Sequence, residues 1–229
     1  MLRLSVIVPA LDEAAGIEAA VAALAPLRSR GAEVIVADGG SADATGALAA
    51  PLADRVIEAP RGRARQMNAG AAAASGDVFV FLHADTRLPD GADREIERAL
   101  APGTHAWGRF DARIEGGAML GVVSRMMNWR SRLTGIATGD QAIFMTRAAF
   151  DAVGGFPDIA LMEDVAICKK LKRVSSPACL AATVVTSGRR WRSHGTLATI
   201  VLMWRLRLAF ALGADPRALA RRYERARSS

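Results

Sequence analysis

The alternation of short apolar runs with helix-forming segments over the first half of the chain constrains the fold more than any other feature. Four apolar runs read as buried strands, at residues 4–8, 33–38, 55–58 and 78–85. Helical composition follows each of them, at residues 13–25, 42–50, 63–74 and 91–100. Apolar strands joined by helices are typical of a parallel sheet covered on both faces. We therefore predict a doubly wound, mostly parallel α/β fold, whose ligands bind beyond the carboxyl ends of the strands.

The second half continues the pattern with wider spacing. Further strands are predicted at residues 105–114, 142–145 and 181–186, and helices at 119–133 and 160–172. Hydrophobic residues make up 51% of the chain and charged residues 23%, as in a globular domain with a core. Because no linker-like stretch divides the chain, we predict one domain over residues 1–195 and a basic helical extension over residues 196–229.

The net charge of +7 is concentrated near the C-terminus. Residues 189–229 hold ten arginines against Asp215 and Glu224, a net charge of +8, while residues 1–188 carry a net charge of −1. A nucleic-acid-binding domain usually spreads its basic residues over one face. The near-neutral body therefore predicts no nucleic-acid partner.

Cysteine content and the N-terminal sequence favour the cytoplasm. Cys168 and Cys179 are too few for a disulfide framework and lack metal-ligand spacing. The first apolar run is short and meets Asp12 and Glu13 at once, unlike a signal peptide.

The apolar stretch at residues 196–212 is interrupted by Arg205 and Arg207, so it is not expected to span a membrane. Two interpretations stay open for it. In the first interpretation, the stretch packs against the domain or against a second copy of the chain in a homodimer. Alternatively, it lies on the inner face of the membrane as a peripheral contact, with Trp191 and Trp204 at the interface.

Polar residues follow three of the predicted strands, whose carboxyl ends meet at one crevice. Asp38 ends the second strand and precedes two glycines and Ser41. Its carboxylate can accept an N–H from a nucleotide base or bind ribose hydroxyls, and the alternative is a tight turn that caps the next helix. His83 and Asp85, two residues apart after the fourth strand, can reach one divalent cation or can serve the turn there.

Further clusters suit anions or proton transfer. Residues 61–68 and 187–194 gather arginines, which favour phosphates but also fit a solvated basic face. Glu163 and Asp164 open a predicted helix, where one can act as a general base or both can favour the helix dipole.

Together these segments resemble the family 2 glycosyltransferases of the GT-A fold over residues 3–195. The matching segments are, in order, SVIVPALDE, EVIVADGGSADAT, RQMNAG, FLHADT, GDQAIF, GGFPDIALMED and GRRW. GRARQMNAGA, FLHADT and GDQAIF look closer still like a small bacterial subgroup named for its association with radical-SAM/selenodomain proteins.

The resemblance implies a nucleotide site and a cation. Pro9 and Glu13 match the first nucleotide-binding loop, Asp38 matches the aspartate that reads the uracil ring, and Arg65 and Asn68 match positions beside the nucleotide. Asp85 matches the last aspartate of the metal-binding DxD motif. A divalent cation, Mn²⁺ or Mg²⁺, is therefore expected on Asp85 and His83.

The resemblance also implies which residues take part in catalysis. Asp164 matches the catalytic base of the ED motif, beside Glu163, and Arg190 and Trp191 match the end of the QxxRW motif near the diphosphate. The loop of Gly139, Asp140 and Gln141 is expected to align the substrates. The sequence departs from the family at three places: His83 replaces an aspartate of DxD, Gly39 an acidic residue, and Ser187 the glutamine of QxxRW.

The implied reaction is an inverting sugar transfer from a nucleotide-diphosphate donor, a UDP-sugar, to an unidentified acceptor. A lipid-linked acceptor and a soluble one are both allowed. The alternatives are a nucleotidyltransferase acting on sugar phosphates, although VPALDE lacks the glycine-rich loop of such enzymes, and a non-catalytic protein that binds nucleotide sugars or an anionic surface.

Overall fold

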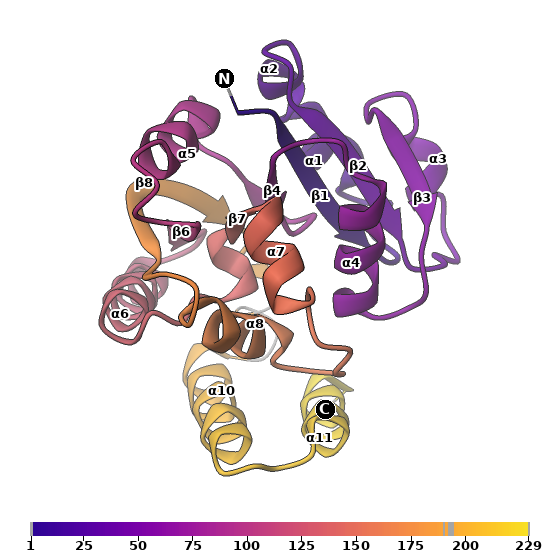
Figure 1. Ribbon diagram of the computed structural model, residues 1–229. Coiled ribbons are helices and arrows are strands. Elements are labelled where there is room, and N and C mark those ends of the chain that lie inside the picture. The colour runs from indigo at the N-terminus through magenta and orange to yellow at the C-terminus, as the bar shows by residue number, and fades with distance from the viewer. Residues whose placement is uncertain (1, 190, 192–194, 229) are drawn as a thin grey trace.

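The computed structural model describes residues 2–189, 191 and 195–228, and its first half forms the predicted parallel strands. These are β1 (Leu4–Ala10), β2 (Glu33–Asp38), β3 (Arg55–Glu58) and β4 (Val78–Phe81). Helical crossovers join them, so they lie across the sheet in the order β3, β2, β1, β4 (Figure 1).

Strand direction changes beyond β4. There β7 (Phe144–Thr146) pairs antiparallel with β4, and β6 (Trp107–Ile114) pairs antiparallel with β7. Then β8 (Ala178–Thr186) runs parallel to β6, and the short β5 (Thr86–Arg87) closes the edge. Over the described residues the order is β3-β2-β1-β4-β7-β6-β8-β5, which confirms the predicted α/β fold with its mostly parallel sheet.

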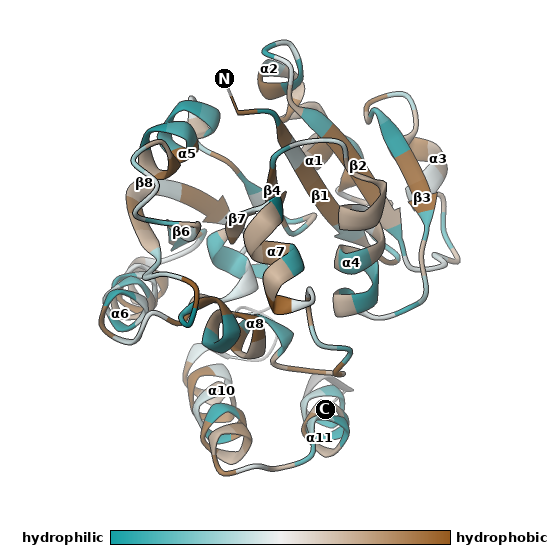
Figure 2. Ribbon diagram, in the orientation of Figure 1, coloured by the Kyte–Doolittle hydropathy of each residue, from teal (hydrophilic) through white to brown (hydrophobic). Residues whose placement is uncertain are grey.

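Helices cover both faces of the sheet. On one face lie α1 (Ile17–Ala22), α2 (Ala25–Arg28), α3 (Thr45–Ala49) and α5 (Ala92–Leu100). On the other lie α4 (Arg63–Ala73), α7 (Arg147–Val153) and α8 (Glu163–Leu171). Val6 and Val8 point to the first layer and Ile7 and Ile35 to the second, as alternation along a strand requires. Figure 2 shows the brown of β1 and β2 between helices that carry teal.

The remaining helices gather at one end of the molecule. In this group, α6 (Ala118–Thr134) lies along β6, where Asn128 exchanges two hydrogen bonds with the backbone of Ala112 at 2.9 and 3.0 Å. The C-terminal extension forms α10 (Thr196–Ala211) and α11 (Pro216–Ser228). A small apolar cluster that includes Met162, Leu206 and Leu219 attaches both helices beside α8. In the part of the chain that the structure describes, no helix is both long and apolar enough to cross a bilayer.

Candidate active site

The loops that follow β1 and β2 are bonded to each other at the carboxyl edge of the sheet. The backbone N–H groups of residues 12, 13 and 14 donate to the side chains of Ser41, Thr45 and Asp43, at 2.9–3.0 Å. Asp12 accepts the N–H of Ala42 at 2.8 Å and adopts a left-handed φ of 53°. The two loops therefore form one rigid rim. Sequence reasoning missed Thr45 and Asp43, although the run SADAT after a strand is a signal for such capping contacts.

Asp38 forms the tight turn that the sequence left as the alternative. Its Oδ1 accepts both the N–H and the hydroxyl of Ser41, at 2.9 and 2.6 Å. Its Oδ2 faces the start of α3, where a Cβ on Gly46 would lie 3.1 Å away. Oδ2 is thus the atom of Asp38 left to accept a bond from a ligand.

Gln66 of α4 fastens the ends of β1 and β2 together. Its buried amide donates to the carbonyl groups of Ala10 at 2.6 Å and Ala37 at 3.0 Å. Gly39 leaves room for it, since a Cβ there would lie 2.9 Å from the Gln66 Cδ. Pro9, predicted to border the nucleotide, is half-buried one residue before Ala10. The sequence showed Gln66 as one polar residue of a cluster; its place in an otherwise alanine-rich helix was the available signal.

Replacing Gln66 with alanine is expected to lower the free energy of unfolding by about 1–3 kcal/mol, because two buried carbonyl groups each lose one hydrogen bond, the Ala10 carbonyl keeping the N–H of Gly39 at 2.9 Å. Urea denaturation measures it. The control on the same helix is Arg65→Ala, which removes an exposed ion pair with Asp158. This variant is expected to lower the free energy of unfolding by less than about 1 kcal/mol. Equal stabilities of the two variants would contradict the role of Gln66.

The segment after β4 is in contact with the predicted base through two residues. His83 Nδ1 lies 3.3 Å from Asp140 Oδ1, and the Cε1–Nε2 edge of its ring fills the space of a Cβ on Gly139. The Gly139 N–H donates in turn to Asp164 Oδ2 at 3.1 Å. A cavity of about 10 Å³, close to the lower limit for one water molecule, adjoins these residues. A continuous chain of contacts therefore joins the predicted metal-binding segment to the predicted base.

The two acidic residues that open α8 have different surroundings. Asp164 is half-buried, and its Oδ1 accepts the N–H of Val165 at 2.7 Å. Glu163 is only 3% exposed and pairs with Arg63 at 3.0 Å. Burial raises the pKa of Glu163; Arg63 opposes the rise and Asp164 adds to it. Burial disfavours the charge on Arg63, but the carboxylates of Glu163, Asp164 and Asp140 outweigh it and raise the pKa of Arg63.

The raised pKa of Glu163 predicts a pH dependence. A carboxyl group whose pKa is higher in the folded state stabilises the fold fully below its unfolded pKa, and that contribution is lost as pH rises through the folded pKa. Glu163→Gln removes this titration. The free energy of unfolding of the variant, relative to the unmodified protein, is therefore expected to rise from pH 5 to pH 8 in denaturant titrations. Parallel pH profiles of the two proteins would contradict a raised pKa of Glu163 in the folded state.

Arg65 and Asn68, predicted to lie beside the nucleotide, hold a loop of the protein. Asn68 accepts the N–H of Phe156 at 2.9 Å and donates to its carbonyl at 2.8 Å. Arg65 pairs with the exposed Asp158 of the same loop at 2.8 Å. Both ends of the Asn68 amide are thus engaged, because the irregular loop between α7 and α8 needs partners for its backbone.

Gln141, expected to align substrates, points into the protein. It is fully buried, accepts the N–H of Thr138 at 3.2 Å and donates to Asn128 Oδ1 at 3.3 Å. These bonds fix the short 3-10 helix η1 (Gly139–Gln141). Gln141 is therefore a positioning residue for Gly139 and Asp140.

The segment predicted to face the diphosphate is described in part. Arg190 lies outside the described residues, and Trp191 is half-buried. Arg189 reaches Glu13 of the rim, with Nη2 and Oε2 3.5 Å apart. This contact brings the start of the segment to the predicted nucleotide loop, and the sequence had shown Arg189 only as one of several clustered arginines.

The residues after β4 fit a divalent cation that takes few protein ligands. The Asp85 carboxylate has a weak contact with the Thr86 hydroxyl at 3.4 Å, so its oxygens are available as hard ligands. His83 is engaged with Asp140 and Gly139, which makes Asp85 the better placed ligand of the predicted pair. Among the described residues no three His, Cys, Asp or Glu side chains gather around one ion. Phosphate and water commonly complete such a coordination shell.

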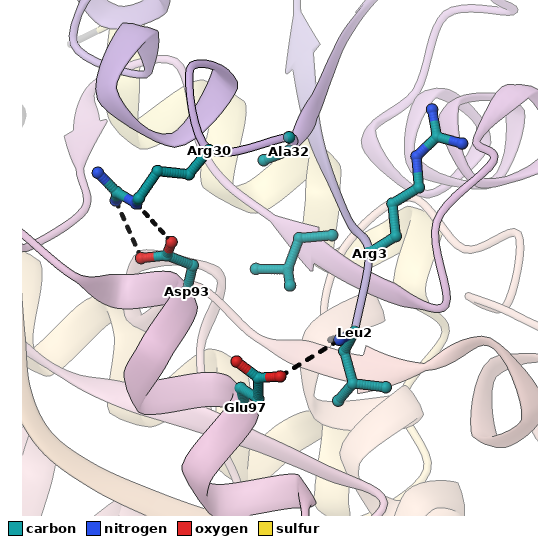
Figure 3. Close-up of a pocket in the computed structure, with 8 residues that line it drawn as sticks. Leu2, Arg3, Arg30, Ala32, Asp93 and Glu97 are labelled. Atoms are coloured by element: carbon teal, nitrogen blue, oxygen red, sulfur yellow. Dashed lines mark hydrogen bonds and ion pairs between the residues drawn. The ribbon is translucent and has the colours of Figure 1, made fainter.

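A further hollow of about 190 Å³ lies at the opposite, amino end of β1 (Figure 3). Arg30 and Asp93 pair across it at 2.6 Å, and Glu97 accepts the N–H of Leu2 at 3.4 Å. Both acidic side chains, which lie on α5, are thus engaged in holding neighbouring segments of the chain. We place the site at the carboxyl edge, where ligands of doubly wound folds bind.

Comparison with known proteins identifies a family. The family described as Glycosyl transferase family 2 matches residues 5–150, which is more than half of the chain and includes β1 to β7. No curated protein sequence matches the chain.

Solved structures share the fold. A mannosyltransferase from Pyrobaculum calidifontis in complex with GDP-Man and Mn²⁺ is 22% identical, with a TM-score of 0.63 over 91% of this chain and 61% of that one. S. aureus TarS 1-349 with UDP-GlcNAc is 16% identical, with a TM-score of 0.65 over 82% and 59%. Glucosyl-3-phosphoglycerate synthase from Mycobacterium tuberculosis, with Mn²⁺, UDP-glucose and phosphoglyceric acid, is 20% identical, with a TM-score of 0.64 over 93% and 81%. The chain thus spans about three fifths of the length of the first two proteins. Sequence identities this low show that the fold is shared and nothing more.

Proposed function

The chain belongs to glycosyl transferase family 2, and on that premise we propose that it moves a sugar from a nucleoside-diphosphate donor to a hydroxyl group of an acceptor. The observation that carries the proposal is the chain of contacts from His83 through Asp140 and Gly139 to Asp164. It supports Asp164 as a carboxylate base at the crevice where Asp85 would hold a cation. Sugar transfer needs both, one for the acceptor proton and one for the leaving diphosphate.

The proposed reaction is a single displacement that inverts the anomeric carbon. The acceptor oxygen bonds to that carbon from the face opposite the diphosphate, and the carbon–oxygen bond to the diphosphate breaks with its electron pair. The acceptor proton passes to Asp164. The N–H groups of Gly139 and Val165 hold the Asp164 carboxylate at 3.1 and 2.7 Å, which fixes its direction. Alignment of this kind accounts for a large part of enzymatic acceleration.

Negative charge on the leaving diphosphate would be met by a cation held on Asp85 and by the arginine-containing segment of residues 189–191. Asp85, with His83 beside it, would hold Mn²⁺ or Mg²⁺; when bound, the ion would neutralise the leaving oxygens. The Mn²⁺ complexes of the mannosyltransferase and the synthase support this assignment. Arg189 stands at Glu13, and Arg190 and Trp191 follow it in the chain, so we assign the diphosphate to that side.

We propose a UDP-sugar as the donor. Oδ2 of Asp38 would read the base, with Pro9 and Glu13 on the neighbouring loop. The complexes of TarS with UDP-GlcNAc and of the synthase with UDP-glucose support uridine, and the GDP-Man complex of the mannosyltransferase is the competing precedent. The transferase domain would span residues 1–195 and the extension residues 196–229, and we keep as a proposal the resemblance of three motifs to the radical-SAM/selenodomain-associated subgroup.

A thermal-shift panel of nucleotide sugars with and without Mn²⁺ tests the proposal. A ligand that binds only the folded state stabilises it, by about 2.7 kcal/mol at a hundred times Kd. The expected result is a rise in Tm with a UDP-sugar that is larger with Mn²⁺. A rise with a nucleoside triphosphate and a sugar phosphate, but with no nucleotide sugar, would favour a nucleotidyltransferase. No rise with any nucleotide would leave only binding to an anionic surface.

We also propose a peripheral membrane contact, because two helices beside the site expose apolar side chains at helical spacing. These are Met119, Val122, Met126, Trp129 and Leu133 on α6, and Leu197, Val201, Trp204, Leu208 and Leu212 on or just after α10. Soluble monomers rarely leave such surfaces uncovered. The occupant we favour is an anionic lipid surface, because residues 189–229 carry a net charge of +8, which attracts such lipids and repels a second copy of the same segment.

Vesicle co-sedimentation tests this contact. The protein is expected to bind vesicles of phosphatidylglycerol and phosphatidylcholine, bind pure phosphatidylcholine weakly, and dissociate in high salt. Serine at both Trp129 and Trp204, which are 66% and 63% exposed, should lower binding at least about tenfold, since each buries apolar area in the interface. Val174→Ser, at an exposed valine outside both helices, is the control. A dimer in gel filtration that the double variant converts to monomer would assign the surface to a second copy.

A further inference from the structure

Three arginines have a buried N–H group without a partner in the part of the chain that the structure describes. One is Nε of Arg109 on β6, whose guanidinium is otherwise paired with Asp111, and the other two lie on helices. Nη2 of Arg130, on α6, and Nε of Arg207, on α10, are buried, and no described residue accepts a hydrogen bond from either. A buried donor left without an acceptor costs about 1–3 kcal/mol. Two such donors on neighbouring helices therefore destabilise the free protein, and a ligand that accepted hydrogen bonds from them would recover that loss.

Arg130 interacts electrostatically with both Arg207 and the proposed base. Burial lowers the pKa of Arg130 to about 10, and the charge of Arg207 adds to the lowering, whereas Asp164 opposes it. The other groups facing Arg130 are Cys168, whose thiol burial keeps neutral, and Arg109, which is paired with Asp111. Arg130 stays charged at neutral pH, so positive charge exceeds negative charge at this place.

The arginine pair lies on the half of the site away from the nucleotide loops. Those loops follow β1 and β2, whereas α6 lies on β6, which β4 and β7 separate from β1. Figure 1 shows α6, α8 and α10 together at the lower end of the molecule, away from β2 and β3. An anion held by Arg130 and Arg207 would thus belong to the acceptor, with Asp164 beside it.

We propose that Arg130 and Arg207 bind a phosphate group of the acceptor. The proposal rests on the sugar-transfer function above. A phosphate dianion matches two guanidinium groups in charge and accepts their N–H bonds. Because Asp164 must take a proton, the phosphate serves as a handle and a hydroxyl of the same molecule is the nucleophile. The acceptor class is therefore an alcohol that also carries phosphate, either in solution or as a lipid headgroup.

Phosphate binding tests the proposal with matched variants. The probes are inorganic phosphate, glycerol phosphate and vesicles of phosphatidic acid in phosphatidylcholine. Both soluble probes are expected to raise the Tm of the unmodified protein, and Arg130→Gln and Arg207→Gln to lower phosphate affinity by about tenfold or more. The controls are Arg125→Gln and Arg205→Gln, at exposed arginines on the same two helices, and these should keep the affinity of the unmodified protein.

The outcomes separate this site from the rest of the function. Vesicle binding lost in the Arg130 and Arg207 variants but kept in the controls would identify a lipid headgroup. Glycerol phosphate binding lost in these variants while vesicle binding persists would identify a soluble acceptor. An equal phosphate response in all four variants would overturn the proposal. So would a loss of UDP-sugar affinity in the Arg130 variant, because the pair would then serve the donor diphosphate. If the unmodified protein binds phosphate but no nucleotide sugar, the transfer function fails while the phosphate site stands.

Discussion

Replacing Asp164 with asparagine is expected to lower the rate of sugar transfer by about 10²–10⁴-fold, the usual contribution of a positioned base. The amide keeps the size of the carboxylate and an oxygen that can accept the N–H of Gly139 or Val165. It cannot take the acceptor proton. The donor should therefore bind as before while turnover collapses, the pattern of a group that acts in the transition state.

The measurement is the release of nucleoside diphosphate from the donor that raises Tm most, with donor affinity determined by calorimetry. Asp158→Asn is the control, since Asp158 forms an exposed ion pair with Arg65. It should retain turnover within a factor of about two, because exposed ion pairs are weak. Near-normal turnover in the Asp164 variant would remove Asp164 from the role of base, and a parallel loss of donor affinity would make it a binding residue.

The central strands β1, β2 and β4 were predictable because they are largely apolar and buried on both faces. The ranges expected for β2 and β3 are those of the structure. The run at residues 78–85 was predicted too long, because β4 ends at Phe81, where the chain turns to bring His83 against Gly139. Hydropathy reports burial, and the segment after Phe81 is partly buried without being extended.

Short helices escaped prediction for a different reason. α7 spans only Arg147–Val153, and its start depends on Thr146, whose hydroxyl accepts the N–H of Ala149 at 3.1 Å. Helices of this length gain their stability from packing on the sheet, which a local pattern does not record.

The orientation of α6 is the reverse of what its pattern indicates. An amphipathic helix usually buries its apolar stripe. Here Ser124 and Ser131 are buried while Met126 and Trp129 are exposed, because Ser124 accepts the N–H of Ile114 at 2.9 Å and donates to the Leu120 carbonyl. Polar contacts to β6 decide the orientation, and they leave the apolar stripe facing outward.

Residue types marked the right region of the site but not each contact. Asn68 and Gln141 are types that bind ligands, yet both face the backbone or side chains of the protein. Arg207 interrupted an apolar helix in the sequence, and only the approach of α10 to α6 puts it beside Arg130. Which partner a polar side chain meets depends on elements far apart in the chain.

Replacing Asp85 with alanine is expected to weaken donor binding in Mn²⁺ by about tenfold to a hundredfold, as loss of a group that supports a metal typically does. Donor affinity without Mn²⁺ should hardly change. The reason is that Asp85 offers weakly engaged carboxylate oxygens at the crevice, whereas the ring of His83 is held by Asp140 and Gly139. His83→Ala should therefore affect Mn²⁺ dependence less than Asp85→Ala does.

Calorimetric titration of the donor with and without Mn²⁺ measures both effects. Asp90→Ala, at an exposed aspartate in the following loop, is the control and should bind the donor like the unmodified protein. If Asp85→Ala binds the donor unchanged in the presence of Mn²⁺, Asp85 is not the ligand. If His83→Ala loses Mn²⁺ dependence as completely, the ring must leave Gly139 when the ion binds, and Asp140 would then move with it. Because Gly139 also holds Asp164, that second result would couple loading of the ion to the position of the base.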